Sequence, residues 1–148
     1  MNIDNLVNKI GALDKNAMDQ AADRLNSLTK PIGSLGVLED LVIQLAGITG
    51  NVMPRVANKM VVVMAGDHGV VEEGVSAAPQ SVTPQMVHNF LNGGAAINVL
   101  ARCAGAQVKV VDVGVADQTL RHPSLISRKV RPGTANMTKG PAMSREEA

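Results

Sequence analysis

The sequence contains no tryptophan and no tyrosine, and Phe90 is its only aromatic residue. Proteins that bind single-stranded nucleic acid stack the bases on aromatic side chains, so this class is excluded. Fourteen Lys and Arg residues against thirteen Asp and Glu give a formal net charge of +1, and no basic block favours nucleic acid or an anionic membrane. We therefore expect small-molecule ligands, with no nucleic-acid partner and no membrane partner.

Cysteine and long apolar runs are also scarce. The single Cys103 cannot form an internal disulfide and has no zinc-binding spacing around it, which favours a reducing compartment, by default the cytoplasm. No apolar run approaches the roughly 20 residues of a transmembrane helix, and the first residues do not have the pattern of a signal peptide. The length of 148 residues suits one domain, whose core must be aliphatic and rich in methionine.

The apolar run at residues 60–65 is the most informative segment. It is short and rich in valine, which predicts a strand buried on both faces and therefore an α/β fold with a parallel sheet between helices. The run ends at Gly66, Asp67, His68 and Gly69. Because ligands bind at the carboxyl ends of parallel strands, this turn is expected to mark the edge of a site.

Two helices are predicted before this strand. Asp14 is a suitable N-cap for a helix that extends to Leu28. After a turn at Pro31, Ser34 can cap a second helix, with Glu39 facing away from the core. The apolar face of that second helix is formed by Leu35, Leu38, Leu41, Val42, Leu45 and Ile48.

A helix and a second strand are predicted after it. The connection over residues 66–82 is unusually long, and long ordered loops are often functional. Thr83 is expected to cap a helix that breaks at Gly93 and Gly94 and ends near residue 104. Residues 107–115 then predict another buried strand, which completes a βαβ unit.

The last residues predict the start of another helix. Ser144 and Glu147 have the spacing of a capping box and follow Gly140 and Pro141. Two strands are also fewer than a doubly wound domain normally contains. We therefore expect a truncated sequence with an incomplete sheet, and hence marginal stability, association or aggregation.

Asp67 and His68 could act as an acid–base pair or as metal ligands. Adjacent residues in a sharp turn usually point apart, so we favour a structural role in which Asp67 binds loop amides. A metal would require a further ligand, such as His88 or His122, and the usual zinc spacings are absent. We expect neither a metal nor a cofactor.

Three other segments could take part in catalysis or ligand binding, but a structural interpretation is favoured for each. Glu72 and Glu73 could include a general base, but an acidic pair without a partner is expected to be solvated. Gly93-Gly94 and residues 131–134 could contact a phosphate. Neither matches a known phosphate-binding loop, so a helix break and a turn are the favoured interpretations.

Five segments that occur in a fixed order carry a resemblance to a known family. They are residues 30–39 (KPIGSLGVLE), 65–70 (AGDHGV), 93–100 (GGAAINVL), 111–114 (VDVG) and 140–144 (GPAMS). The series resembles the amino-terminal part of the nicotinate-nucleotide:dimethylbenzimidazole phosphoribosyltransferases, over nearly the whole chain. Members of this family are more than twice as long.

The resemblance implies a Rossmann-like parallel sheet with flanking helices and a small helical subdomain. Residues 1–50 would belong to that subdomain, and residues 51–148 would form the first part of the sheet domain. It also implies a homodimer in the full-length form. The implied reaction transfers a 5-phosphoribosyl group from nicotinate mononucleotide to 5,6-dimethylbenzimidazole, giving α-ribazole 5'-phosphate and nicotinate, in assembly of the lower ligand of cobalamin.

The resemblance also implies which residues contact the acceptor base. They are Ala78, Val82 and Met86, and family members carry a serine and a glutamine at the first and last of these positions. Asp67 and His68 would support the active-site loop. The catalytic base of the family is a glutamate near its carboxyl terminus, so no catalytic residue is assigned here and this chain alone is expected to be inactive.

Two other functions are compatible with the residues alone. One is a metal-dependent hydrolase that uses Asp67, His68 and a further histidine. The other is a non-catalytic module that binds a benzimidazole.

Overall fold

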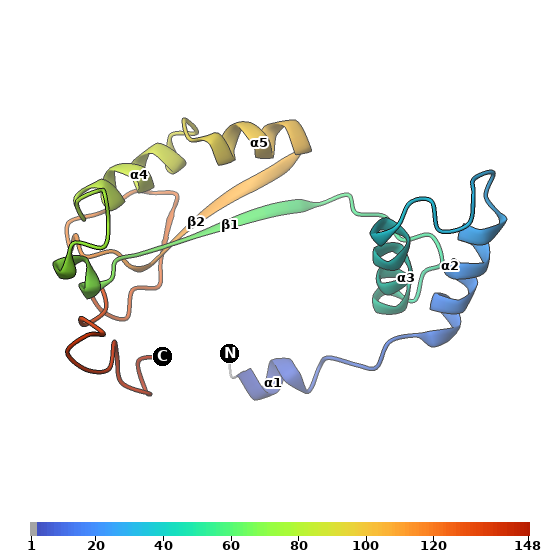
Figure 1. Cartoon of the computed structure of the whole chain (residues 1–148), viewed down its shortest axis with the longest axis horizontal. Coiled ribbons are helices and arrows are strands. Elements are labelled where there is room, and N and C mark those ends of the chain that lie inside the picture. Colours follow the sequence, from blue (N-terminus) through green and yellow to red (C-terminus); the bar gives the residue numbers. More distant parts are fainter. Residues whose placement is uncertain (1–2) are drawn as a thin grey trace. The chain divides into compact units, whose positions relative to one another are not determined.

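The computed structural model of the chain describes residues 3–148. The chain divides into two compact units, Met1–Ala57 and Asn58–Ala148, which are described in turn (Figure 1). The sequence suggested a division near residue 50. The assignment of these units to a small subdomain and a sheet domain stays a prediction.

The first unit contains helices α1 (Ile3–Val7), α2 (Lys15–Ser27) and α3 (Val37–Thr49). The predicted cap of α2 is present, because Asp14 Oδ1 accepts a hydrogen bond from the Ala17 amide at 3.0 Å. The buried residues of α2 are Ala17, Ala21 and Leu25, which recur every fourth position and form one face of the helix. This helix packs against α3.

The prediction for α3 was wrong in three respects. The N-cap is Gly36 with φ 55°, and Ser34 does not cap the helix. Glu39 is buried because its carboxylate accepts hydrogen bonds from Lys30 Nζ at 2.8 Å and from the Leu35 amide at 3.0 Å. The hydrogen bond from Lys30 is the main reason that the pKa of Glu39 lies below its usual value. Four leucine and isoleucine residues of the predicted buried face are exposed instead: Leu35, Leu38, Leu41 and Ile48.

The second unit is built on a three-stranded parallel sheet in the order β1-β2-β3. Strands β1 (Lys59–Gly66) and β2 (Ala106–Gly114) are connected by helices α4 (Val82–Leu91) and α5 (Ala96–Ala104), which confirms the predicted βαβ unit. Strand β3 (Leu125–Ser127) was not predicted, because three residues are too few for a periodic pattern. The α/β fold with a parallel sheet and flanking helices is therefore confirmed.

Strand β1 is covered on one face only, which corrects the prediction of two buried faces. Helices α4 and α5 lie on the same side of the sheet (Figure 1). The residues that face them join a core formed by Ala65, Val87, Val110, Val115 and Leu120. Successive side chains of a strand point to opposite faces, and Met60, Val62 and Met64 are 54%, 48% and 70% exposed. None of the helices described within residues 3–148 is long and apolar enough to span a bilayer.

Candidate active site

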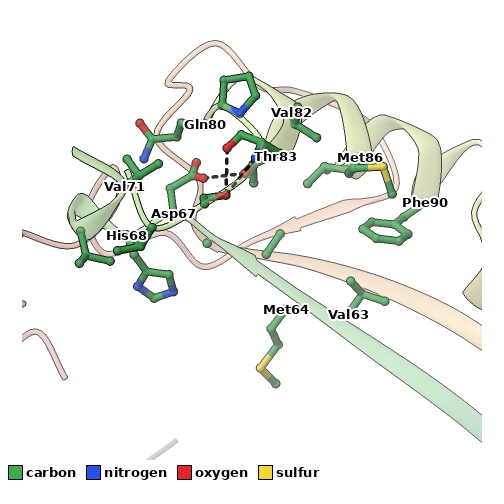
Figure 2. Close-up of a pocket in the computed structure, with 18 residues that line it drawn as sticks. Val63, Met64, Asp67, His68, Val71, Gln80, Val82, Thr83, Met86 and Phe90 are labelled. Atoms are coloured by element: carbon green, nitrogen blue, oxygen red, sulfur yellow. Dashed lines mark hydrogen bonds between the residues drawn. The ribbon is translucent and has the colours of Figure 1, made fainter. Parts of the chain in front are cut away.

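A pocket of about 530 Å³ lies at the carboxyl end of β1. Its walls come from the end of β1, from the connection that follows and from α4 (Figure 2). The sequence-derived site residues all line it: Asp67, His68, Ala78, Val82 and Met86. The structure therefore brings these residues together, although their roles stay predictions.

Part of the connection after β1 forms a short helix. A 3-10 helix, η1 (Gly69–Glu73), follows Asp67 and His68 and ends at Gly74, whose φ of 70° favours glycine. Val70 and Val71 of η1 line the pocket. Residues 75–79 are exposed and continue the wall toward α4.

Asp67 is buried and its carboxylate joins three segments. Its Oδ1 accepts a hydrogen bond from the Thr83 hydroxyl at 2.6 Å, and its Oδ2 accepts one from the Ala116 amide at 2.7 Å. Thr83 belongs to the first turn of α4, whereas Ala116 follows β2. Both carboxylate oxygens are therefore occupied, and the first turn of α4 is attached to the carboxyl edge of the sheet.

The backbone of this turn binds residues 133–134. The Thr134 amide donates to the Asp67 carbonyl at 3.0 Å, and the Gly69 amide donates to the Thr134 carbonyl at 3.1 Å. Gly133 has a φ of 72°, a backbone conformation that favours glycine, and lies in contact with the Asp67 backbone. The favoured interpretation of residues 131–134 as a structural turn fits these contacts.

Thr83 does not cap α4 as predicted. The helix starts at Val82 with Ser81 in the N-cap position, and no side chain accepts a hydrogen bond there. The Thr83 hydroxyl donates to the buried Asp67 carboxylate, and a hydrogen bond with a charged partner is stronger than one between neutral groups.

Glu72 and Glu73 are not simply solvated, which corrects the sequence interpretation. Asn136 Nδ2 donates to Glu73 Oε1 at 2.6 Å, and Lys139 Nζ lies 2.7 Å from Glu72 Oε2. The hydrogen bond from Lys139 is the main cause that lowers the pKa of Glu72, and Asn136 adds to it. The hydrogen bonds of Glu72 and Glu73 therefore attach η1 to residues 136–139.

The histidines do not gather around Asp67. The rings of His88 and His122 contact each other edge to face, with centroids 6.5 Å apart. His68 is exposed, and Figure 2 shows its ring on the Met64 side of β1, away from α4. Within residues 3–148, no group of three His, Cys, Asp or Glu side chains could hold a metal ion. The metal-dependent hydrolase therefore has no support in the structure.

The two glycines between the helices form a break. Gly93 has a φ of 77°, and the Gly94 amide donates to the Asn89 carbonyl at 3.0 Å.

Near the last residues, the predicted capping box is present: the Ser144 amide donates to Glu147 Oε2 at 2.8 Å, and the Glu147 amide donates to Ser144 Oγ at 3.2 Å. The first of these bonds is the main cause that lowers the pKa of Glu147.

Comparison with known proteins identifies the family. A family model described as phosphoribosyltransferase matches residues 10–148. The nicotinate-nucleotide–dimethylbenzimidazole phosphoribosyltransferase of Chloroflexus aurantiacus is 58% identical over 146 residues, which are 99% of this chain and 42% of that protein. That of Halalkalibacterium halodurans is 55% identical over 143 residues, which cover 97% of this chain and 40% of the relative.

The chain belongs to the dimethylbenzimidazole phosphoribosyltransferase family. A crystal structure of the family member from Thermus thermophilus has a TM-score of 0.85 at 54% identity, covering 91% of this chain and 41% of that one. The expected family is thereby confirmed. The chain spans about two fifths of the length of the curated relatives that it matches.

Several lining residues of the pocket were not predicted from the sequence. They include Val63 of β1, Val71 of η1, Gln80 of the connection and Phe90 of α4. Val63 could have been found from the period-two pattern, because it faces the same side of β1 as Ala65. Gln80 lies in an irregular segment and Val71 in a 3-10 helix of five residues, which is too short for a periodic pattern, so spacing does not determine the direction of either side chain.

Proposed function

We propose that this chain forms the acceptor-binding part of an enzyme that transfers a 5-phosphoribosyl group from nicotinate mononucleotide to 5,6-dimethylbenzimidazole. The products would be α-ribazole 5'-phosphate and nicotinate, in assembly of the lower ligand of cobalamin. One observation carries the proposal: in a member of this family, Ala78, Val82 and Met86 line a single apolar pocket at the carboxyl end of a parallel strand.

The chemistry requires a base, which the α4 side of this pocket does not supply, because His68 is exposed and its ring lies on the Met64 side of β1. Nicotinate is a good leaving group because it departs from a cationic pyridinium, whereas the neutral benzimidazole must lose its ring proton as it attacks. Asp67 contributes the carboxylate among the lining residues, and Thr83 and Ala116 occupy both of its oxygens. The proposed base is therefore the glutamate that the family carries near its carboxyl terminus, and Asp67 has a positioning role.

The proposal extends to partners and location. Small-molecule substrates fit an apolar pocket of about 530 Å³. The family resemblance supports a homodimer in the full-length form, and the single cysteine supports a reducing compartment such as the cytoplasm.

A hybrid protein tests the function. Residues 1–148 would be joined to the remaining three fifths of the Chloroflexus aurantiacus relative, and nicotinate release with dimethylbenzimidazole would be followed by chromatography. We expect transfer by the hybrid and none by the 148-residue chain alone, and replacement of the family's glutamate by glutamine should abolish it. A folded hybrid that binds both substrates without transfer would refute the proposal. Tight benzimidazole binding by the chain alone would instead favour the non-catalytic module.

A further inference from the structure

Most polar side chains that line the pocket already have partners within the protein. Asp67 accepts hydrogen bonds from Thr83 and Ala116, and the Thr83 hydroxyl is used as the donor of the first bond. The Ser76 hydroxyl donates to the Ala78 carbonyl at 2.9 Å and accepts from the Ala78 amide at 3.2 Å. The donor hydrogens of Thr83 and Ser76 are therefore used within the protein, and the Asp67 carboxylate is held in orientation by its two bonds.

Two lining side chains make no hydrogen bond with the described residues 3–148, namely Gln80 and His68. They differ in position. His68 is exposed, and its ring lies on the Met64 side of β1 in Figure 2. Gln80 is half-buried and lies on the other side of the strand, where α4 contributes Val82 and Met86. Gln80 is therefore the side chain best placed to hydrogen-bond a ligand between β1 and α4.

The pocket also has an apolar end and a polar end. Val63, Met86 and Phe90 lie together at one end in Figure 2, whereas the polar side chains of Gln80 and Asp67 lie at the other end, beside Val71. Dimethylbenzimidazole has the same division, because its methylated ring is apolar and its imidazole edge carries one N–H donor and one nitrogen acceptor. A glutamine amide offers a carbonyl acceptor and an NH₂ donor, so it can bind either nitrogen.

We propose that Gln80 is a specificity-determining residue that binds the imidazole edge of the acceptor base, with the methylated ring directed toward Phe90. This inference rests on the proposed function of the pocket. Ala78 and Met86 have no group that could form a strong hydrogen bond with a ring nitrogen. The amide of Gln80, two residues after Ala78, supplies that capacity from a neighbouring position on the same wall.

The test compares two ligands of similar size with the full 148-residue chain. 5,6-Dimethylbenzimidazole has both ring nitrogens, whereas benzothiophene is a fused bicycle with none. Binding would be followed through the ¹³C-labelled methyl group of Met86, which lines the pocket. Gln80→Met removes the amide while keeping the length of the side chain. We expect it to weaken dimethylbenzimidazole about tenfold and benzothiophene less than about twofold.

Gln85→Met is the matched control, because Gln85 is exposed and lies outside the pocket lining. It should leave both affinities unchanged, and circular dichroism should show that both variants are folded. Equal weakening of the two ligands by Gln80→Met, or no weakening, would overturn the inference while leaving the proposed function intact. If neither ligand shifts the Met86 signal at millimolar concentration, the inference about Gln80 is overturned, whereas the proposed function is decided separately by transfer in the hybrid protein.

Discussion

Asp67 is a buried carboxylate that joins the elements forming the walls of the pocket. Its two oxygens bind the first turn of α4 and the segment that follows β2, and its carbonyl binds Thr134. A buried charge is costly unless hydrogen bonds satisfy it, so these contacts are also what allows Asp67 to be buried. The walls that carry Val82 and Met86 therefore depend on this residue.

Removal of the Thr83 hydroxyl tests this dependence. Thr83→Val keeps the shape of the side chain but leaves Asp67 Oδ1 without its 2.6 Å donor. Because hydrogen bonds to charged groups contribute more than neutral ones, we expect the free energy of unfolding to fall by about 2 kcal/mol. Urea unfolding measures the change. Thr83→Ser retains the hydroxyl and should lose less than half as much; equal losses in the two variants would contradict the role of the hydrogen bond.

The attachment of η1 to residues 136–139 is expected to depend on pH. The pKa of Glu72 is lowered in the folded chain by Lys139, so this contact contributes stability above the ordinary value of 4.5 and loses it as the pH falls through the lower folded pKa. Carbon-detected NMR of the Glu72 carboxyl should give a midpoint below 4.5. Lys139→Met should raise that midpoint, and an unchanged midpoint would show that the ion pair does not form in solution.

Close backbone contact makes the β1–η1 turn sensitive to a single methyl group. A Cβ at Gly69 would lie 2.6 Å from the Asn136 amide nitrogen and 2.7 Å from the Thr134 carbonyl oxygen, so the backbone must move. Gly69→Ala should therefore lower the free energy of unfolding by about 1–3 kcal/mol. Gly140→Ala is the control, because nothing lies within 4 Å of its added Cβ. Equal urea midpoints for the two variants would contradict the close contact.

The elements with periodic patterns were predictable from the sequence, and the connections between them were not. The cap at Asp14, the break at Gly93 and the parallel pairing of β1 with β2 follow from local chemistry and from the βαβ pattern. The exposure predicted for Glu39 and the capping role predicted for Thr83 were wrong. Their hydrogen-bond partners, Lys30 and Asp67, lie nine and sixteen residues away along the chain. Such hydrogen bonds are formed by tertiary structure, which residue spacing does not show.

At the scale of the whole molecule, the open face of the sheet is the main departure from expectation. Met60, Val62 and Met64 form an exposed apolar row on β1, and Val113 of β2 is 40% exposed. Exposed apolar surface of this kind promotes association. The sequence correctly predicted apolar strands, but it could not show which face the described helices cover.

Charged substitutions on this face should reduce association. We expect the unmodified chain to sediment faster as its concentration increases, and Val62→Lys with Met64→Lys to remove most of that dependence. Leu100→Lys on α5 is the control, because Leu100 is 64% exposed but lies on a helix rather than on the open face of the sheet. A sharp melting transition of a monomer that does not change with concentration would contradict this prediction.

The position of Asp67 also affects the order in which the molecule can fold. Its side-chain partners lie 16 and 49 residues away along the chain, and closing such loops costs entropy before the contacts form. The carboxylate has both of its partners only after β2 has paired with β1 and Ala116 has reached the turn. During synthesis, the lining residues 63–90 therefore leave the ribosome before Ala116, which supplies the last bond to the carboxylate that joins the pocket walls.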